Sequence, residues 1–423
     1  MVECLNPVQA RLNVRGDRLW QSLMELARIG ATAKGGSCRL ALTAEDGQGR
    51  DLVVGWMREA GLQIQIDEVG NIFGLRAGRD PELAPVMTGS HIDTQPTGGR
   101  FDGCFGVMAG LEVMRSLQEQ GVETEAPLAL AIWTNEEGSR FVPTMMGSGV
   151  HCAIFPKQVA LEARDGQGIS VAQALDGIGY RGTLPVGQLQ PQCYLEAHIE
   201  QGPILEAEDK TIGVVTGSLG LRWYDVTVTG MEAHAGPTPM PMRQDALYAA
   251  AELMREVVDI ANAAPFAPAG RGTVGEVHVH PNSRNVIPGQ VKFTVDLRHP
   301  DMAQLNAMEA RFRAAAARVA RGTAGLQVSV VDVQEFPATP FAAHLIDAVE
   351  EAAQARGLSH QRILTGAGHD AVYMARRVPT AMVFVPCKDG ISHNESEDAD
   401  PVHLAAGCQV LCDVMLAQAG QAR

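Results

Sequence analysis

The sequence predicts an α/β main domain that is interrupted by a smaller α+β domain of ferredoxin-like topology. Two observations carry this prediction. Short apolar segments that end in polar residues alternate with helical segments early in the chain, and this alternation resumes after about residue 335. The segment between them has the order βαββαβ. We therefore expect a discontinuous domain of residues 1–216 and 335–423, with an inserted domain of residues 217–334.

The main domain is expected to contain strands whose polar ends meet. Helices are predicted over residues 8–30 and 46–60 from the spacing of their apolar residues. Four later segments begin as β-rich apolar runs and finish in polar residues: LAPVMTGSHID, PLALAIWTNEE, CYLEAHIEQG and PTAMVFVPCKDGISH. Ligands of open α/β sheets bind beyond the carboxyl ends of the strands, so these four polar ends are the candidate site.

The inserted domain is predicted from the middle of the chain. RWYDVTVTG (222–230) alternates as a strand does, and residues 241–262 form an Ala-rich helical segment. Residues 273–280 and 290–299 predict a hairpin. A second helix is expected over residues 302–321, and the strand LQVSVVDV follows it.

Composition and charge exclude several classes of protein. The 423 residues are too many for one hydrophobic core and suit two domains. The net charge of −15 and the lack of a Lys/Arg run argue against a nucleic-acid partner. We expect no secretory signal, and no segment has the ~18 consecutive apolar residues of a membrane span. The eight scattered cysteines, with no CxxC pair, predict a reducing, cytoplasmic location.

The first candidate ligands for a metal ion are His91 and Asp102, in the segment TGSHIDTQPTGGRFDG. The glycines before and after Asp102 allow a tight loop that returns it to His91. Asp93 is placed to accept the second imidazole N–H and so orient the ring. Taken alone, His91 has a structural alternative, and a helix N-cap in a glycine loop is the favoured interpretation of Asp102.

Further candidates follow the other predicted strands. Glu136 and Glu137 end the segment LALAIWTNEE, where the alternative is a solvated acidic turn. His198 and His393 lie at the ends of the last two apolar runs. Nitrogen and carboxylate ligands without cysteine suit Zn²⁺, Mn²⁺, Co²⁺ or Ni²⁺.

The number of candidate ligands favours two ions over one. Three His, one Asp and one Glu exceed the three protein ligands of a mononuclear catalytic zinc. If one carboxylate bridges two ions, each ion has three protein ligands. Asp102, on its glycine-flanked loop, is the best candidate for this bridge. Glu136 then remains for the proton shuttle that hydrolysis requires.

The inserted domain carries three polar candidates of its own. His234 lies in AHAGPTP, Asn285 in SRNVIPG and Arg298 in VDLRHPD. The Arg guanidinium would bind a substrate carboxylate through two hydrogen bonds. The His and the Asn could donate to the oxyanion of a tetrahedral intermediate. Each residue alone has a simpler alternative: a loop His, a turn Asn or a surface Arg.

An ordered set of short motifs between residues 88 and 396 resembles a known family. The motifs are SHIDT with GGRFDG, NEEGSRF, HIEQGP, HAGPTPM, RNVIPG, GAGHDA and DGISHN. Together they are similar to the hydantoinase/carbamoylase branch of the M20-type amidohydrolases. That branch holds N-carbamoyl-L-amino-acid hydrolases, allantoate amidohydrolases and β-ureidopropionases. The resemblance implies a di-metal aminopeptidase-like catalytic domain with an inserted ferredoxin-like α+β lid, which also forms the interface of a homodimer.

The resemblance also implies which residues hold the two divalent ions of each chain. Asp102 with His91 and His198 would hold one ion. Asp102 with Glu137 and His393 would hold the other.

Roles away from the ions are implied in the same way. Glu136 would be the general base. The substrate-binding residues would be Gln201, His234, Asn285, Arg298 and His369. In such dimers, some of the lid residues would reach the site of the neighbouring subunit.

These features predict a metal-dependent amidohydrolase of N-carbamoyl-L-amino acids that releases the amino acid, CO₂ and ammonia. Its substrate is a small ureido compound that carries a carboxylate. Allantoate and β-ureido acids are the alternative substrates, and a related metallopeptidase is less favoured because the carbamoylase motifs occur together. A different class also fits the ligands, namely a non-catalytic protein that binds small carboxylates or metal. Glu136, at the position of a base, favours the enzyme.

Overall fold

The computed structural model describes residues 12–420 and forms two compact units. Unit 1 comprises Met1–Gly217 and Pro340–Arg423, and unit 2 comprises Ser218–Thr339. The sequence placed the end of the insertion at residue 334. Unit 2 continues beyond that point because its last long strand, β13, runs over Gln327–Phe336.

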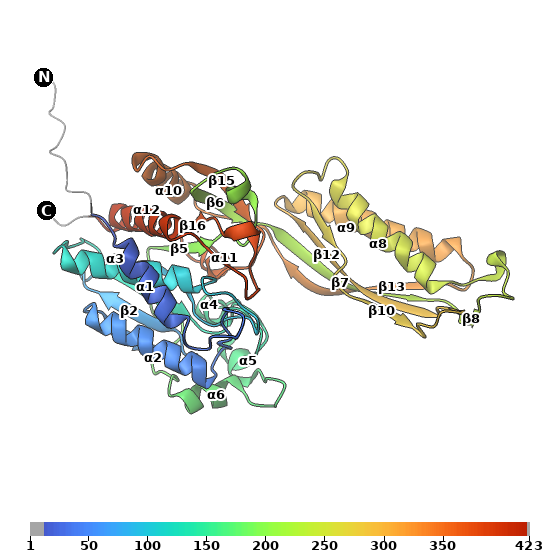
Figure 1. The fold of residues 1–423 in the computed structure, drawn as a ribbon, viewed down its shortest axis with the longest axis horizontal. Coiled ribbons are helices and arrows are strands. Elements are labelled where there is room, and N and C mark those ends of the chain that lie inside the picture. Colours follow the sequence, from blue (N-terminus) through green and yellow to red (C-terminus); the bar gives the residue numbers. More distant parts are fainter. Residues whose placement is uncertain (1–11, 421–423) are drawn as a thin grey trace, which may run out of the picture. The chain divides into compact units, whose positions relative to one another are not determined.

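Unit 1 is built around a nine-stranded mixed sheet (Figure 1). The strand order is β1-β2-β4-β3-β5-β16-β6-β14, and β15 pairs with β6. The strands are β1 (Gln63–Ile66), β2 (Ile72–Arg76), β3 (Val86–His91), β4 (Leu128–Trp133), β5 (Cys193–Ile199), β6 (Ile212–Ser218), β14 (Thr339–Pro340), β15 (His360–Thr365) and β16 (Thr380–Val385).

The four central strands are parallel to one another and entirely buried. β3 pairs with β4 and with β5, and β5 pairs with β16, each time in parallel. Every residue of these four strands is buried, as expected for strands with helices on both faces. They are the four apolar runs predicted from the sequence. Their carboxyl ends therefore lie at one edge of the sheet.

Helices cover both faces of the sheet. α3, α10 and α12 pack on one face, and α4 and α11 pack on the other. The helices are α1 (Gly16–Leu26), α2 (Ala44–Glu59), α3 (Cys104–Glu119), α4 (Met146–His151), α5 (Lys157–Glu162), α6 (Val171–Ile178), α7 (Ile204–Ala207), α10 (Ala343–Ala355), α11 (Asp370–Met374) and α12 (Pro401–Ala419). A short 3-10 turn, η2, covers Lys388–Gly390.

Two predicted helix boundaries differ from the structure. The first helix was expected over residues 8–30; α1 begins at Gly16 and ends at Leu26, and residues 8–11 lie outside the described residues. α2 begins two residues before the predicted start, because the Thr43 hydroxyl accepts the backbone N–H of Asp46 and caps the helix.

α12 is long and apolar enough to cross a membrane by length and composition, and it is the one described helix of that kind. In the fold it packs against α1, α3, α10 and the strands β3, β5 and β16. These contacts make it a core helix of unit 1, and this explains its composition.

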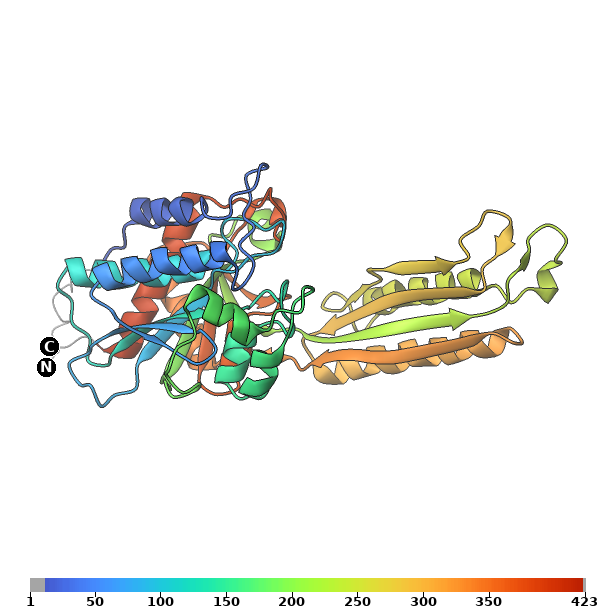
Figure 2. The same ribbon diagram turned by 90° about the horizontal axis from the view of Figure 1, so that it is seen from below.

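Unit 2 has a five-stranded antiparallel sheet with two helices on one face. The strand order is β10-β12-β7-β13, and β9 also pairs with β12. Figure 2 shows α8 and α9 behind these long strands. The elements are β7 (Gly220–Thr229), β8 (Ala233–His234), η1 (Met240–Met242), α8 (Ala246–Asn262), β9 (Arg271–Thr273), β10 (Val277–His280), β11 (Val286–Ile287), β12 (Gln290–His299), α9 (Met302–Gly322) and β13.

The predicted βαββαβ order is confirmed, with three short strands added to it. The core between the sheet and the helices includes Tyr224, Leu253, Phe293 and Phe312, all buried. α8 starts later than residue 241, because the Asp245 carboxylate caps it by accepting two backbone N–H groups.

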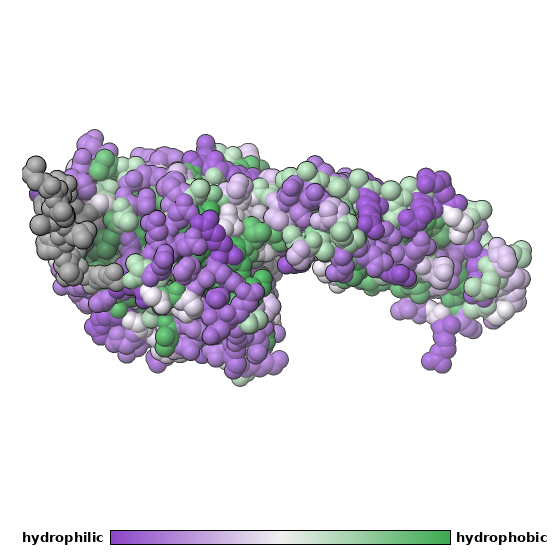
Figure 3. Space-filling view, turned by 90° about the horizontal axis from the view of Figure 1, so that it is seen from above, coloured by the Kyte–Doolittle hydropathy of each residue, from purple (hydrophilic) through white to green (hydrophobic). Residues whose placement is uncertain are grey.

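The surface view in Figure 3 shows hydrophilic residues over most of the visible face of each unit, with small apolar groups between them.

Candidate metal centre

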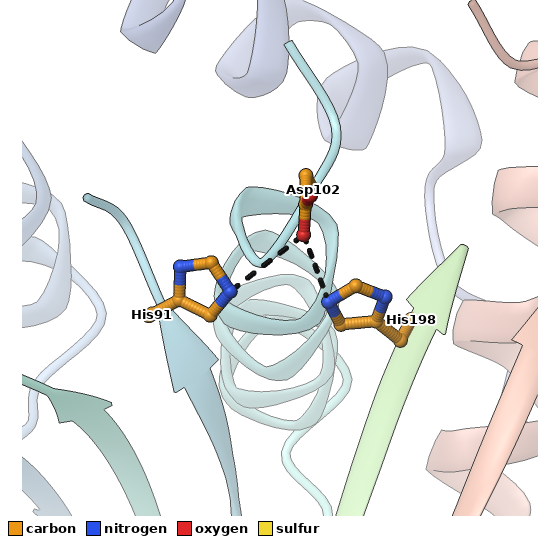
Figure 4. Close-up of side chains that lie close together, drawn as sticks. All are labelled: His91, Asp102 and His198. Carbon is orange, nitrogen blue, oxygen red and sulfur yellow. Dashed lines mark ion pairs between the residues drawn. The ribbon is translucent and has the colours of Figure 1, made fainter. Parts of the chain in front are cut away.

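The first group of donor atoms combines His91, His198 and Asp102 at the carboxyl edge of the sheet (Figure 4). His91 ends β3 and His198 lies near the end of β5, the neighbouring parallel strand. Asp102 lies in the loop before α3. Its Oδ1 atom is 3.7 Å from Nε2 of His91 and 3.3 Å from Nε2 of His198. All three side chains are buried.

Backbone carbonyls fix the orientation of both histidine rings. Nδ1 of His91 is 2.9 Å from the carbonyl oxygen of Asp93, and Nδ1 of His198 is 2.9 Å from that of Ile199. A carbonyl only accepts hydrogen bonds, so each Nδ1 carries a proton, and in the neutral ring each Nε2 has a lone pair. The backbone N–H of Gly103 donates to Nε2 of His198 at 3.1 Å, which requires the same tautomer. Both Nε2 lone pairs therefore face Asp102.

Gly103 follows Asp102 with a φ of +65°, a backbone conformation that favours glycine. A Cβ atom there would lie 2.3 Å from Cε1 of His91. The position therefore needs glycine both for its backbone angle and for the approach of the His91 ring.

The carboxylate of Asp93 has a different role from the one expected. It lies 3.9 Å from Nδ1 of His91, and the backbone carbonyl of the same residue makes the contact with the ring instead. The carboxylate accepts the backbone N–H groups of Glu136 at 3.3 Å and Glu137 at 3.2 Å. Burial raises the pKa of Asp93 to about 7. Asp93 therefore holds the turn after β4 in place.

The second group of donor atoms combines Asp102, Glu137 and His393. Nε2 of His393 is 3.2 Å from Oδ2 of Asp102 and 3.3 Å from Oε2 of Glu137. Gln95, which the sequence analysis missed, donates to Oε2 of Glu137 at 2.7 Å. The two oxygens of Asp102 thus face different groups, Oδ1 the first and Oδ2 the second.

Glu136 lies beside the first group. Its Oε2 atom is 3.5 Å from Nε2 of His91, and the side chain is buried. Asn135 turns the chain at the end of β4 with a φ of +53°, which Asn tolerates better than most residues. Burial raises the pKa of Glu136 well above its usual range, and the carboxylates of Asp370 and Glu137 raise it further.

Gln201 and His369, expected near the ions, both lie at this edge. Nε2 of Gln201 donates to Oδ2 of Asp102 at 2.8 Å, and its Oε1 atom is buried without a hydrogen-bond partner. The ring of His369 is 4.5 Å from that of His198, centroid to centroid. Nε2 of His369 is 3.0 Å from the Thr365 hydroxyl.

Glu196, which the sequence analysis missed, forms a third group of donor atoms with His198 and His369. Its oxygens already accept the Ser90 hydroxyl at 2.7 Å and the Ala371 backbone N–H at 2.9 Å. We therefore assign it a structural role. The available signal was a carboxylate two residues before His198 in an otherwise apolar strand, where both side chains share one face of the sheet.

The three candidates of the inserted domain lie in unit 2, where the fold brings His234 and Asn285 together and places Arg298 apart from them. His234 is in β8, which pairs with β11, and the backbone N–H of Ala235 donates to the carbonyl of Asn285 at 2.9 Å. Arg298 is near the far end of β12, whose first residue is Gln290. The eight-residue separation along the strand corresponds to roughly 26 Å. The Arg298 guanidinium pairs with Asp296 at 2.6 Å.

The donor atoms fit divalent cations in both chemistry and charge. Asp102, Glu136 and Glu137 are largely buried, and they form ion-pair contacts with the rings of His91, His198 and His393. Burial raises the pKa of Glu137 well above its usual range, and Asp102 raises it further. Buried carboxylates without cationic partners are costly, and divalent ions offset this cost.

Comparison with known proteins shows the family. The profile of Peptidase family M20/M25/M40 matches residues 87–417. The chain belongs to this family. The match covers β4, β5, β16, all of β3 except Val86, and every candidate residue of the metal centre, so the resemblance seen in the motifs is confirmed.

Relatives of the chain cover nearly its whole length. An N-carbamoyl-L-amino-acid amidohydrolase of Rhizobium meliloti is 46% identical over 95% of this chain and 96% of its own. An allantoate amidohydrolase of Bacillus subtilis is 34% identical over 92% of this chain and 94% of its own. The crystal structure of a hydantoinase/carbamoylase family amidase from Burkholderia multivorans has a TM-score of 0.94 and 54% identity, covering 96% of this chain and 98% of that one.

Removal of Asp102 tests the shared carboxylate. We expect Asp102→Ala to hold one Mn²⁺ ion or none, because both groups of donors lose an oxygen. Metal content after equilibrium dialysis measures this. Asp67→Asn is the matched control, since Asp67 is a buried carboxylate in the turn before β2 that belongs to neither group. Two retained ions in Asp102→Ala would contradict the bridging arrangement.

Proposed function

We propose that the protein hydrolyses the carbamoyl C–N bond of N-carbamoyl-L-amino acids, releasing the amino acid, CO₂ and ammonia. The observation that carries the proposal is the pair of donor groups that share Asp102, with Glu136 beside them. The name of the Rhizobium meliloti relative, at 46% identity, supports this choice of substrate.

Each chain would hold two divalent cations. One would be held by His91, Asp102 and His198, and the other by Asp102, Glu137 and His393. Their nitrogen and oxygen donors suit Zn²⁺, Mn²⁺, Co²⁺ or Ni²⁺. When bound, such ions supply Lewis-acid charge and lower the pKa of water.

Glu136 is the general base of the proposed reaction. Its carboxylate is buried at the edge where the two donor groups meet, and it belongs to neither of them. It would accept a proton from the attacking water and return it to the leaving nitrogen. Proton transfer of this kind contributes about 10²–10⁴ to the rate.

Residues of unit 2 would bind the substrate. Their positions within the unit favour a homodimer. Arg298 would hold the substrate carboxylate through its guanidinium, while His234 and Asn285 would polarise the carbamoyl oxygen. Arg298 lies roughly 26 Å along β12 from Gln290, the end of the strand that follows the β8–β11 pair, and this separates Arg298 from His234 within one unit. A second copy of the chain would supply His234 and Asn285, with unit 2 forming the interface.

Other substrates define the alternatives. Allantoate is favoured next, because the Bacillus subtilis relative carries that name at 34% identity. A β-ureido acid is the third candidate. A non-catalytic protein that binds small carboxylates would show saturable binding without release of ammonia.

The seven described cysteines are free, which supports a reducing, cytoplasmic location.

The substrate is tested by ammonia release from metal-loaded protein. The panel comprises N-carbamoyl-L-amino acids, their D-enantiomers, allantoate and N-carbamoyl-β-alanine. We expect turnover of the N-carbamoyl-L-amino acids. A chelator should abolish this turnover, because the proposed reaction depends on the bound cations. Turnover of allantoate alone would replace the proposed substrate, and no release from any compound would contradict the proposed activity.

Substitution of Glu136 tests the base. We expect Glu136→Gln to lower kcat by about 10²–10⁴ while two ions remain bound, because the amide keeps the shape of the side chain but accepts no proton. Steady-state kinetics and metal content measure the two effects. Activity within a few-fold of the unmodified protein would show that another group acts as the base.

Mixing of subunits tests the shared site. His234→Ala and Arg298→Ala should each be nearly inactive alone. After denaturation and refolding together, about a quarter of the original activity should return, because half of the dimers are mixed and one site in each is intact. Failure of the mixture to exceed its separate components would place both residues in a site formed by a single chain.

A further inference from the structure

We propose that Glu397 is a positioning residue that ties the Asp102 loop to the segment carrying His393. This inference rests on the proposed two-ion centre. Glu397 is 1% exposed and follows His393 by four residues. It belongs to neither donor group, and the sequence analysis did not select it.

The carboxylate of Glu397 holds the Asp102 loop through its backbone. Oε1 accepts the N–H groups of Phe101 at 2.9 Å and Asp102 at 3.2 Å. These residues are almost 300 positions away in the sequence, so the contact joins two distant segments. Two backbone N–H groups therefore converge on one carboxyl oxygen of Glu397.

The other oxygen of Glu397 reaches the second segment. Oε2 lies 3.0 Å from the hydroxyl of Ser392, the residue before His393. The same hydroxyl is 3.0 Å from Oδ2 of Asp102, and its oxygen accepts a hydrogen bond from Nε2 of Gln201 at 3.2 Å. Ser392 therefore lies between the two carboxylates, next to both Asp102 and His393.

The surrounding chain leaves space for this carboxylate. A Cβ atom on Gly99 would lie 2.0 Å from the carboxyl carbon of Glu397, so only glycine fits there. The flanking residues repeat the connection, because Arg100 pairs with Asp398 at 3.0 Å. The two segments are thus joined at three consecutive residues, Arg100, Phe101 and Asp102.

The two donor groups depend on Glu397 to different degrees. His91 and His198 lie on strands that are held by parallel pairing in the centre of the sheet. His393 lies on a loop, has a φ of +54° and is half exposed. Loss of Glu397 should therefore weaken the group of Asp102, Glu137 and His393 more than the first group.

Calorimetric titration of metal-free protein with Mn²⁺ tests the inference. We expect Glu397→Gln to weaken one of two binding steps about 10–100-fold, the range typical for residues that support metal ligands. The affected step should be the one that His393→Ala abolishes, and the other should stay within a few-fold. Glu397→Asp, which keeps the charge, should recover part of the affinity.

Glu112→Gln is the matched control. Glu112 is a buried carboxylate that accepts the backbone N–H of Arg15 at 2.8 Å and lies on α3, away from the donor groups. Thermal unfolding of each metal-free variant separates lost stability from lost affinity. If Glu397→Gln does not fold, Ser392→Ala tests the same connection and should weaken the same step.

The outcomes separate this inference from the proposed function. Fewer than two binding steps in the unmodified protein would contradict the two-ion centre itself. Two steps in the unmodified protein, with unchanged affinities in Glu397→Gln and Ser392→Ala, would overturn only the role of Glu397. An equal loss in both steps would also overturn it, because the selective effect on the His393 group would be absent.

Discussion

The structure depends on one electrostatic constraint, the gathering of buried carboxylates at the edge of a parallel sheet. Asp102, Glu136 and Glu137 meet there, in contact with the rings of His91 and His393. Such charges destabilise a fold unless cations or hydrogen bonds offset them. The rigid central strands resist the resulting repulsion, since β3, β4, β5 and β16 are buried along their whole length.

Much of this arrangement could be predicted from the sequence. Apolar runs that end in polar residues define parallel strands, and parallel strands bring their carboxyl ends to one edge. His91, Glu137 and His198 follow from that rule. His393 was selected by the same rule, although it lies on a loop after β16, and Asp102 was selected from the glycines around it.

The missed contacts have a common physical cause. Glu397 and Ser392 meet Asp102 across almost 300 residues of chain, and no local pattern encodes such a contact. The role of Asp93 differed because the turn after His91 brings a carbonyl, rather than the carboxylate, to the ring. Loop geometry of this kind depends on tertiary packing that single-sequence patterns do not contain.

The orientation of His91 and His198 has a consequence for mutational tolerance. Both rings are held by main-chain carbonyls, those of Asp93 and Ile199. A main-chain oxygen is present whatever the side chain, so these two contacts do not depend on which side chains stand at positions 93 and 199. Changes of those side chains that preserve the local backbone therefore leave the ring nitrogens facing the same point.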